Sequence, residues 1–165
     1  VALNTVAKKF SNIKLTLVGD GNRLQEYKTL VADLGLADRV EFTGWLNSRE
    51  IESLAAKSSI GIFPSRIESF GLSVVEAMAT GLPVIAARGG AVPENIEDGV
   101  TGTLVPVNNS DALAGAINRA LENPKPSEMM AKAAKSAVQQ KFSWDRAADS
   151  MIEVYKNIRM KTPSI

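Results

Sequence analysis

The sequence predicts an α/β fold built on a Rossmann-like, doubly wound parallel sheet. Segments with the periodicity of strands and of helices alternate along the chain, which is typical of a parallel sheet covered by helices. One strand segment, residues 82–88, is almost entirely apolar, as expected for a strand buried on both faces. With 165 residues, of which 45% are hydrophobic, the chain has enough apolar material for one core.

Five short runs, most of them rich in β-branched residues and followed by turns, are the expected strands. They cover residues 13–21, 39–44, 60–65, 82–88 and 102–107. The expected helices cover residues 1–10, 23–35, 47–59, 72–81, 93–99, 110–123, 126–142 and 143–160. Residues 122–127, with the sequence ENPKPS, form the one linker-like break, and it separates helices within a single domain.

The ends of several helices can be assigned from capping residues. Gly35 and Gly81 follow apolar helical stripes and are expected to end their helices. Asn47 or Ser48 is expected to open the third helix, and Ser110 to open the helix that follows the last strand.

Composition excludes several functional classes. The formal net charge is +1, the acidic and basic residues are interspersed, and no basic stripe suits nucleic acid, which we therefore do not expect as a partner. The absence of cysteine and histidine from the sequence excludes disulfides, Cys/His zinc sites and histidine-based triads. Any chemistry must therefore use carboxylates, backbone amides and cations.

Three glycine-containing turns follow strands of the predicted sheet. They cover residues 18–22, 42–48 and 63–73. Open α/β sheets bind ligands at the carboxyl ends of their strands, and each turn leads into a helix N-terminus that suits a phosphate. The pattern favours a nucleotide, although the sequence contains neither a complete dinucleotide fingerprint nor a P-loop.

Two glutamates, Glu68 and Glu76, stand on either side of a Phe-Gly turn in the last of these segments. If the helix starts near Leu72 or Ser73, Glu76 lies in its first turn and Glu68 in the loop before it. Glu76 could then accept two hydrogen bonds from a cis-diol such as ribose, and Glu68 could hold hydroxyls of a sugar.

The residues between the glutamates allow two interpretations. The backbone amides of Phe70, Gly71 and Leu72 could point toward a diphosphate. Alternatively, Ser73 and Glu76 form a capping box, in which the acid satisfies only a backbone N–H. The spacing alone leaves both interpretations open.

The run from residue 63 to residue 107 resembles the donor-binding half of retaining glycosyltransferases of the GT-B fold, family four in the carbohydrate-enzyme classification. Glu68 and Glu76 match the family's pair of glutamates with seven residues between them. Further matches are residues 89–90, Glu94, 99–102 and 104–107. The resemblance extends from residue 15 to the last helix.

This resemblance implies a role for each matching position. Glu68, the candidate catalytic residue, would contact hydroxyls of the donor sugar, and Glu76 the ribose. Gly19 would face the phosphates, unless it is only a tight turn, and backbone at Leu46 would meet the base, whereas Trp45 is expected to pack. The expected donor-binding residues are therefore Gly19, Leu46, Glu68, Phe70, Gly71, Leu72, Ser73 and Glu76. Ser73 departs from the family pattern, which usually has proline there.

The resemblance also implies an enzyme: a hexosyltransferase that uses a UDP-, GDP- or ADP-sugar without a cofactor or a metal site. Its acceptor would be a glycan or a lipid-linked molecule in polysaccharide or glycoconjugate biosynthesis. Residues 1–165 are expected to be its carboxy-terminal domain, without the amino-terminal acceptor domain. The domain's central first strand, with an Arg and a nearby Lys that neutralise the diphosphate, would precede Val1, and Arg66 is only a weak substitute. The isolated chain is expected to bind the donor without catalysis.

Two alternatives remain beside this interpretation: a non-catalytic nucleotide-sugar-binding module, and a different GT-B enzyme such as a sugar-nucleotide epimerase. We expect a cytoplasmic location, with peripheral association at the cytoplasmic membrane face as an alternative. The basic residues Lys132, Lys135 and Lys141 are better explained as a solvated helix face than as a membrane-binding patch.

Overall fold

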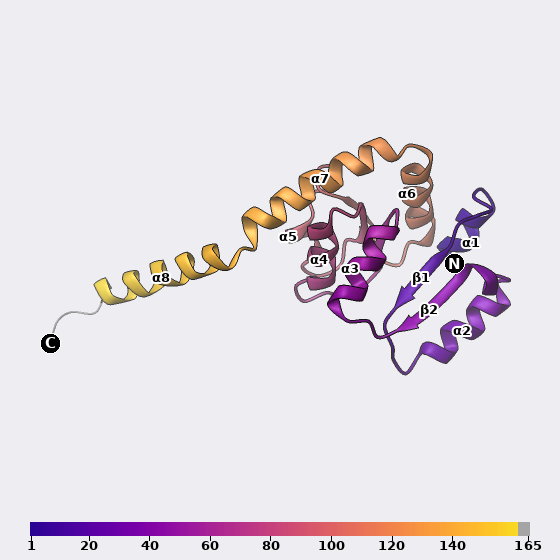
Figure 1. Cartoon of the computed structure of the whole chain (residues 1–165), viewed down its shortest axis with the longest axis horizontal. Coiled ribbons are helices and arrows are strands. Elements are labelled where there is room, and N and C mark those ends of the chain that lie inside the picture. Colours follow the sequence, from indigo (N-terminus) through magenta and orange to yellow (C-terminus); the bar gives the residue numbers. More distant parts are fainter. Residues whose placement is uncertain (162–165) are drawn as a thin grey trace.

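The computed structural model of the chain describes residues 1–161, so residues 162–165 of the expected domain lie outside the described part. It is an α/β structure with parallel strands, as predicted, and Figure 1 gives its arrangement. The strands are β1 (Leu15–Val18), β2 (Val40–Gly44), β3 (Gly61–Phe63), β4 (Val84–Ala87) and β5 (Thr103–Val105). The helices are α1 (Ala2–Ala7), α2 (Leu24–Asp33), α3 (Ser48–Lys57), α4 (Leu72–Thr80), α5 (Val92–Asn95), α6 (Ser110–Glu122), α7 (Pro124–Lys141) and α8 (Trp144–Lys161), with a short 3₁₀ helix at Ala37–Arg39.

The described strands form two parallel sheets and not the single sheet that the sequence suggested. One contains β1 and β2, and the other has the order β3-β4-β5. β1 pairs only with β2 and β3 only with β4, so one edge of each of these two strands lacks a strand partner within residues 1–161. The central strand expected between them stays a prediction.

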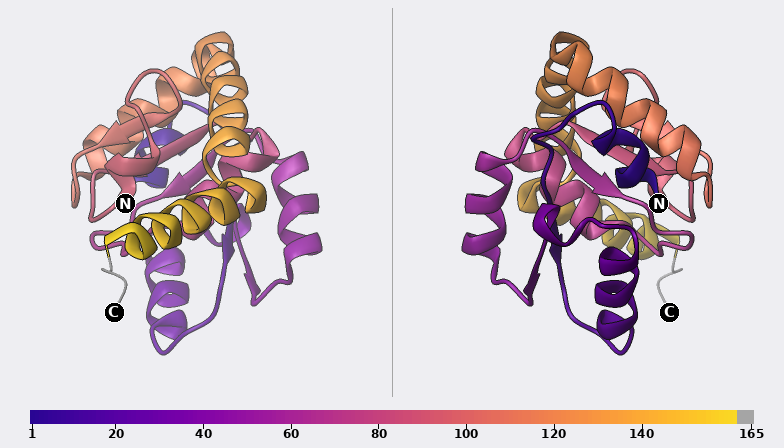
Figure 2. Two further views of the ribbon diagram at one scale, coloured as in Figure 1. Left: turned by 90° about the vertical axis from the view of Figure 1, so that its left-hand side faces the viewer. Right: turned by 90° about the vertical axis from the view of Figure 1, so that its right-hand side faces the viewer.

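The three-stranded sheet carries the core between two helical layers. Ala86 and Leu104 pack on one face with α4, α5 and α7, whereas Ile85 and Val105 pack on the other with α1 and α6. All four residues of β4 are buried, as predicted from its apolar sequence. Figure 2 shows these helices around the sheet from two sides.

The two-stranded sheet is far less covered. Apart from Val6 and Leu36, every buried apolar side chain of the described chain comes after residue 73. Helices α2 and α3 contain no buried residue. Leu17 in the middle of β1 is only half-buried.

Most of the capping predictions are confirmed. Gly35 has a φ of +65° just after α2, and two hydrogen bonds, from Gly35 N–H to the Ala32 carbonyl and from Leu36 N–H to the Val31 carbonyl, form a Schellman motif. Gly81 ends α4 with a φ of +86°. These positive φ values explain why glycine stands at both positions.

The predicted caps of α3 and α6 have different outcomes. Asn47, one of the two residues expected to open the third helix, caps α3, and the structure adds a complete capping box with Glu50. Ser110 was predicted to cap α6, but it is the first helical residue, and the Oδ1 atom of Asn109 accepts the hydrogen bond from Ala112 N–H at 2.8 Å. Asparagine and serine are about equally good caps, so the sequence could not separate these two neighbours.

The break predicted at residues 122–127 does separate two helices, but it is shorter than predicted: Asn123 alone lies between α6 and α7. α7 begins at Pro124, immediately after Asn123, because proline is tolerated in the first turn of a helix. Beyond α7, α8 leads away from the body of the domain (Figure 1), with Met151, Val154 and Tyr155 among its exposed side chains. Within the described residues, none of the helices is both long enough and apolar enough to cross a membrane.

Candidate ligand-binding site

The N-terminus of α4 is open. Its N-cap is Gly71, which adopts the left-handed conformation with φ of 84° and ψ of 42°, and no side chain caps the helix. The N–H groups of Gly71, Leu72 and Ser73 therefore have no hydrogen-bond acceptor within residues 1–161. Because such N–H groups and the positive end of the helix dipole attract anions, this is the position at which a phosphate would bind best.

Glu68 and Glu76 lie on either side of this open helix end, but not quite as predicted. Glu68 is half-buried in the loop after β3, whereas Glu76 is exposed at the fifth residue of α4, in its second turn rather than its first. The Ser73–Glu76 capping box does not form, since the cap is Gly71 and Ser73 is inside the helix. The predicted helix start at Leu72 is confirmed, and the capping box, which the residue spacing had left open, is excluded.

Gly89 and Gly90 hold the loop that carries Glu68. A Cβ on Gly90 would lie 2.1 Å from the Glu68 carbonyl oxygen and 2.6 Å from its nitrogen. A Cβ on Gly89 would lie 2.5 Å from the Arg66 carbonyl oxygen. In addition, Ala91 N–H donates to the Glu68 carbonyl at 2.8 Å. The β4–α5 turn therefore fixes the backbone of Glu68 by direct contact, a role that the sequence pattern did not reveal.

A second support comes from α5. The side-chain amide of Asn95 donates a hydrogen bond to the carbonyl of Phe70. Sequence reasoning did not identify Asn95, since the two residues are 25 positions apart and nothing local to either one signals the contact.

Gly19 lies at the carboxyl end of the other sheet, beside Gly44, two residues before Leu46. Gly19 N–H donates to the Gly44 carbonyl at 2.8 Å, and Gly44 precedes the segment that contains Leu46. Leu46 is half-buried. Trp45, which was expected to pack, is instead 77% exposed, because the positive φ of Gly44 turns the chain out of the strand. These residues belong to the β1–β2 sheet, whereas Glu68 to Glu76 follow the other sheet.

The cations at this edge differ in their surroundings. Arg66 is exposed in the loop before Glu68. Arg23, at the start of α2, hydrogen-bonds the Glu26 carboxylate at 2.6 and 2.8 Å, and this contact holds the pKa of Glu26 below its ordinary value. Residues 1–161 contain no group of three or more acidic side chains placed to hold a metal ion.

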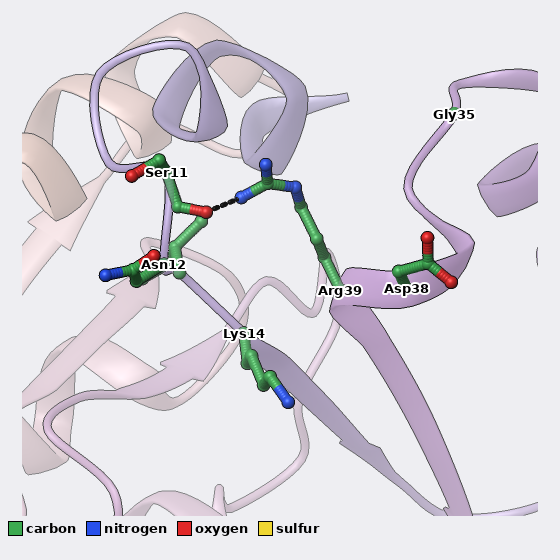
Figure 3. A pocket seen from close by; sticks show the side chains of 7 residues that line it. Ser11, Asn12, Lys14, Gly35, Asp38 and Arg39 are labelled. Carbon is green, nitrogen blue, oxygen red and sulfur yellow. Dashed lines mark hydrogen bonds between the residues drawn. The ribbon is translucent and has the colours of Figure 1, made fainter.

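A cavity lies at the opposite, amino-terminal edge of the β1–β2 sheet (Figure 3). It measures about 530 Å³ and is lined by Ser11, Asn12, Ile13, Lys14, Gly35, Asp38 and Arg39. The Arg39 guanidinium crosses it and donates to the Ser11 carbonyl. Because ligands of parallel α/β sheets bind at the carboxyl ends of strands, we do not assign this cavity to the candidate site.

Comparison with solved structures shows that the fold is that of a GT-B-type domain. Sucrose-phosphate synthase from Thermosynechococcus elongatus superimposes with a TM-score of 0.84 and 30% identity, over 98% of this chain and 42% of that one. HepE of Anabaena, solved in complex with UDP-glucose, superimposes with a TM-score of 0.85 and 30% identity, over 94% of this chain and 44% of that one.

The family follows from the sequence comparisons. Residues 1–137 match the model of "Glycosyl transferases group 1". The D-inositol 3-phosphate glycosyltransferase of Streptomyces griseus is 40% identical over 126 residues, which are 76% of this chain and 26% of that protein. The chain therefore belongs to the group 1 glycosyltransferases. It spans less than half the length of these relatives.

Proposed function

We propose that this chain is the donor-binding domain of a retaining glycosyltransferase and that it holds a nucleotide diphosphate sugar at the carboxyl edge of β3. One observation carries the proposal: the N-terminus of α4 has no side-chain cap and lies between two glutamates that are not used in capping. Since the chain spans less than half of its relatives, the glycan or lipid-linked acceptor would bind to a different part of the full-length enzyme.

Each group at this edge has a defined task in the proposal. The N–H groups of Gly71 and Leu72 donate to the diphosphate and stabilise the negative charge that grows on it as the sugar leaves. Glu76 accepts hydrogen bonds from the ribose hydroxyls, and Glu68 accepts them from the donor sugar. Retention of configuration is inferred from the resemblance of the glutamate pair to the retaining family.

The remaining contacts come from the other sheet. The turn at Gly19 faces the phosphates, and the backbone at Leu46 meets the base. The likeness to HepE in complex with UDP-glucose supports a nucleotide-sugar donor, and the base is one of uracil, guanine or adenine.

Titration of the chain with UDP, GDP and ADP, followed by NMR chemical shifts, tests the proposal. One nucleotide is expected to move the resonances of Gly71, Leu72 and Glu76 and thereby identify the base. Nucleotide-dependent shifts confined to residues 11–14 and 35–39, at the opposite edge, would contradict it.

Replacing the ribose-binding carboxylate tests the glutamates separately. Glu76→Ala is expected to weaken nucleotide binding by roughly 10- to 100-fold, since a hydrogen bond to a charged group contributes about 1.5–3 kcal/mol. Glu128→Ala, which removes an exposed carboxylate on α7, is the matched control and should leave binding unchanged. If Glu76→Ala instead lowers only the stability, the carboxylate has a structural role.

The reaction class is tested on the full-length enzyme by product analysis. Transfer to an acceptor with retained configuration is expected. Release of an epimerised sugar nucleotide without acceptor, or phosphate-dependent cleavage, would assign the domain to a different GT-B enzyme.

A further inference from the structure

Helix α5 and the end of α7 both contact Phe70, in the turn that carries the proposed diphosphate-binding N–H groups. Asn95, the last residue of α5, donates its side-chain amide to the carbonyl of Phe70. The Phe70 ring meets Phe142 edge to face, with ring centroids 5.7 Å apart and an interplanar angle of 79°. The backbone and the side chain of Phe70 are therefore held by two different elements.

The end of α7 is in turn tied to α5. The Lys141 ammonium donates to the Glu94 carbonyl at 2.8 Å and lies 5.1 Å from the centroid of the Phe142 ring. This contact connects Phe142 to the residue just before Asn95, so the two supports of Phe70 form one connected unit. Lys141 is exposed, as predicted for a solvated helix face, and this hydrogen bond gives it a specific partner as well.

The hydrogen bond from Asn95 controls the direction of the next amide. In a trans peptide the C=O and the N–H point in opposite directions. No cis peptide bond occurs in the described chain, so fixing the Phe70 carbonyl toward α5 turns the Gly71 N–H away from it. Gly71 is also the N-cap of α4, with φ of 84°. A Cβ on Gly71 would lie 3.4 Å from the side-chain amide nitrogen of Asn95. Asn95 therefore fits closely against the open end of the helix.

We propose that Asn95 is a positioning residue for diphosphate binding: it fixes the Phe70–Gly71 peptide so that the Gly71 N–H is preorganised for a phosphate oxygen. This inference rests on the proposed function. Asn95 touches the turn and not the ligand, and it lowers the ordering cost of binding, which is how a preorganised site gains affinity. Asn95 therefore contributes to the binding of the phosphates alone, because the base and the ribose are held by other residues.

The test uses Asn95→Asp, which keeps the size of the side chain but replaces the donating amide by a carboxylate that repels the Phe70 carbonyl. We expect the affinity for a nucleoside diphosphate to fall about tenfold, whereas the affinity for the unphosphorylated nucleoside changes less than twofold. The reason is that a misdirected Gly71 N–H weakens only the hydrogen bond to the phosphates. Asn95→Ala should behave in the same way.

Asn109→Ala is the matched control. It removes an asparagine side chain that caps α6 through Ala112 N–H, so it weakens the fold without touching the turn. It should leave the ratio of diphosphate to nucleoside affinity unchanged. If the Asn95 variants lower both affinities in the same proportion, or neither, Asn95 is only a structural residue and the proposal is wrong.

A second readout needs no nucleotide. In the free protein, Asn95→Asp is expected to move the NMR resonance of the Gly71 amide and to speed its hydrogen exchange, whereas Asn109→Ala leaves both unchanged. An unchanged Gly71 amide overturns the positioning role even if nucleotides bind. A changed amide in a chain that binds no nucleotide supports the positioning of Gly71 and overturns the proposed function instead.

Discussion

The two sheets of this domain are built from similar strands, yet only one of them is supported by a core. β4 is buried along its whole length between helices on both faces, whereas β1 and β2 are at most half-buried and their helices α2 and α3 bury no residue. Strand sequence alone therefore does not create a core. What differs within residues 1–161 is the number of neighbouring strands: β4 has one on each side, whereas β1 has β2 on one side.

The largest expected contrast comes from removing one apolar side chain in each half. Met78 is 1% exposed in the core of the three-stranded sheet, so Met78→Ala should lower the free energy of unfolding by about 2–5 kcal/mol. Leu17→Ala, in half-buried β1, should cost about 1 kcal/mol or less. Urea denaturation of both variants measures the difference, and equal losses would mean that the two sheets share one core.

A glycine in each half provides the next comparison. Gly90 and Gly44 both have positive φ, of 54° and 70°, so alanine strains the backbone at either position. Only Gly90 also faces backbone atoms that a Cβ would strike, whereas a Cβ on Gly44 meets nothing within 4 Å. Gly90→Ala should therefore cost roughly 1–3 kcal/mol more than Gly44→Ala in urea denaturation. Similar costs would show that the β4–α5 turn moves aside easily.

The helix caps allow a smaller contrast. Asn47 caps α3, which follows the sparsely covered β1–β2 sheet (the open half), and Asn109 caps α6, which covers the three-stranded sheet (the packed half). Alanine at either position should cost about 1 kcal/mol. In α6, whose Ala116 and Ile117 are buried, the loss should lower global stability, whereas in α3 it should appear as local fraying. Amide hydrogen exchange distinguishes the two, and global destabilisation by Asn47→Ala would contradict the separation of the halves.

The smallest effect is expected from the Arg23–Glu26 pair of the open half. The hydrogen bond from Arg23 lowers the pKa of Glu26, so its stabilising contribution is present above the ordinary glutamate pKa and is lost as the pH falls through the lowered value. Both side chains are exposed, so the contribution is small. NMR titration of the Glu26 carboxyl should give a higher pKa in Arg23→Gln. An unchanged value would mean that the pair does not persist in solution.

The sequence predicted the features that depend on neighbouring residues. The five strands, the glycines that end α2 and α4, and a cap at Asn47 or Ser48 all have local signals, and the structure contains them, with Asn47 as the cap. The features that it missed depend on contacts between distant segments. The hydrogen bond from Asn95 to Phe70, the fit of Gly90 against Glu68 and the exposure of Trp45 follow from how α5, the β4–α5 turn and β2 are placed in space.

The candidate site shows the same division. The glutamate pair and the glycine between the two acids indicated where the site lies, because residue spacing and turn chemistry are visible in a sequence. The start of α4 at Leu72 was predicted, but its cap was not, since Gly71 and Ser73 are both acceptable caps. Only the fold showed that glycine is the cap and that Ser73 and Glu76 form no capping box.

Within residues 1–161, one edge of β1 and one edge of β3 have no strand partner, and this has a consequence for a preparation of these residues alone. Natural edge strands are usually protected from intermolecular pairing by charged residues, prolines or bulges. The residues of β1 are Leu-Thr-Leu-Val and those of β3 are Gly-Ile-Phe, so neither contains a charge or a proline, and Val18 at the end of β1 is 46% exposed. Concentrated preparations of the chain are therefore expected to self-associate through these edges, and dilution should reverse the association before it reaches aggregation.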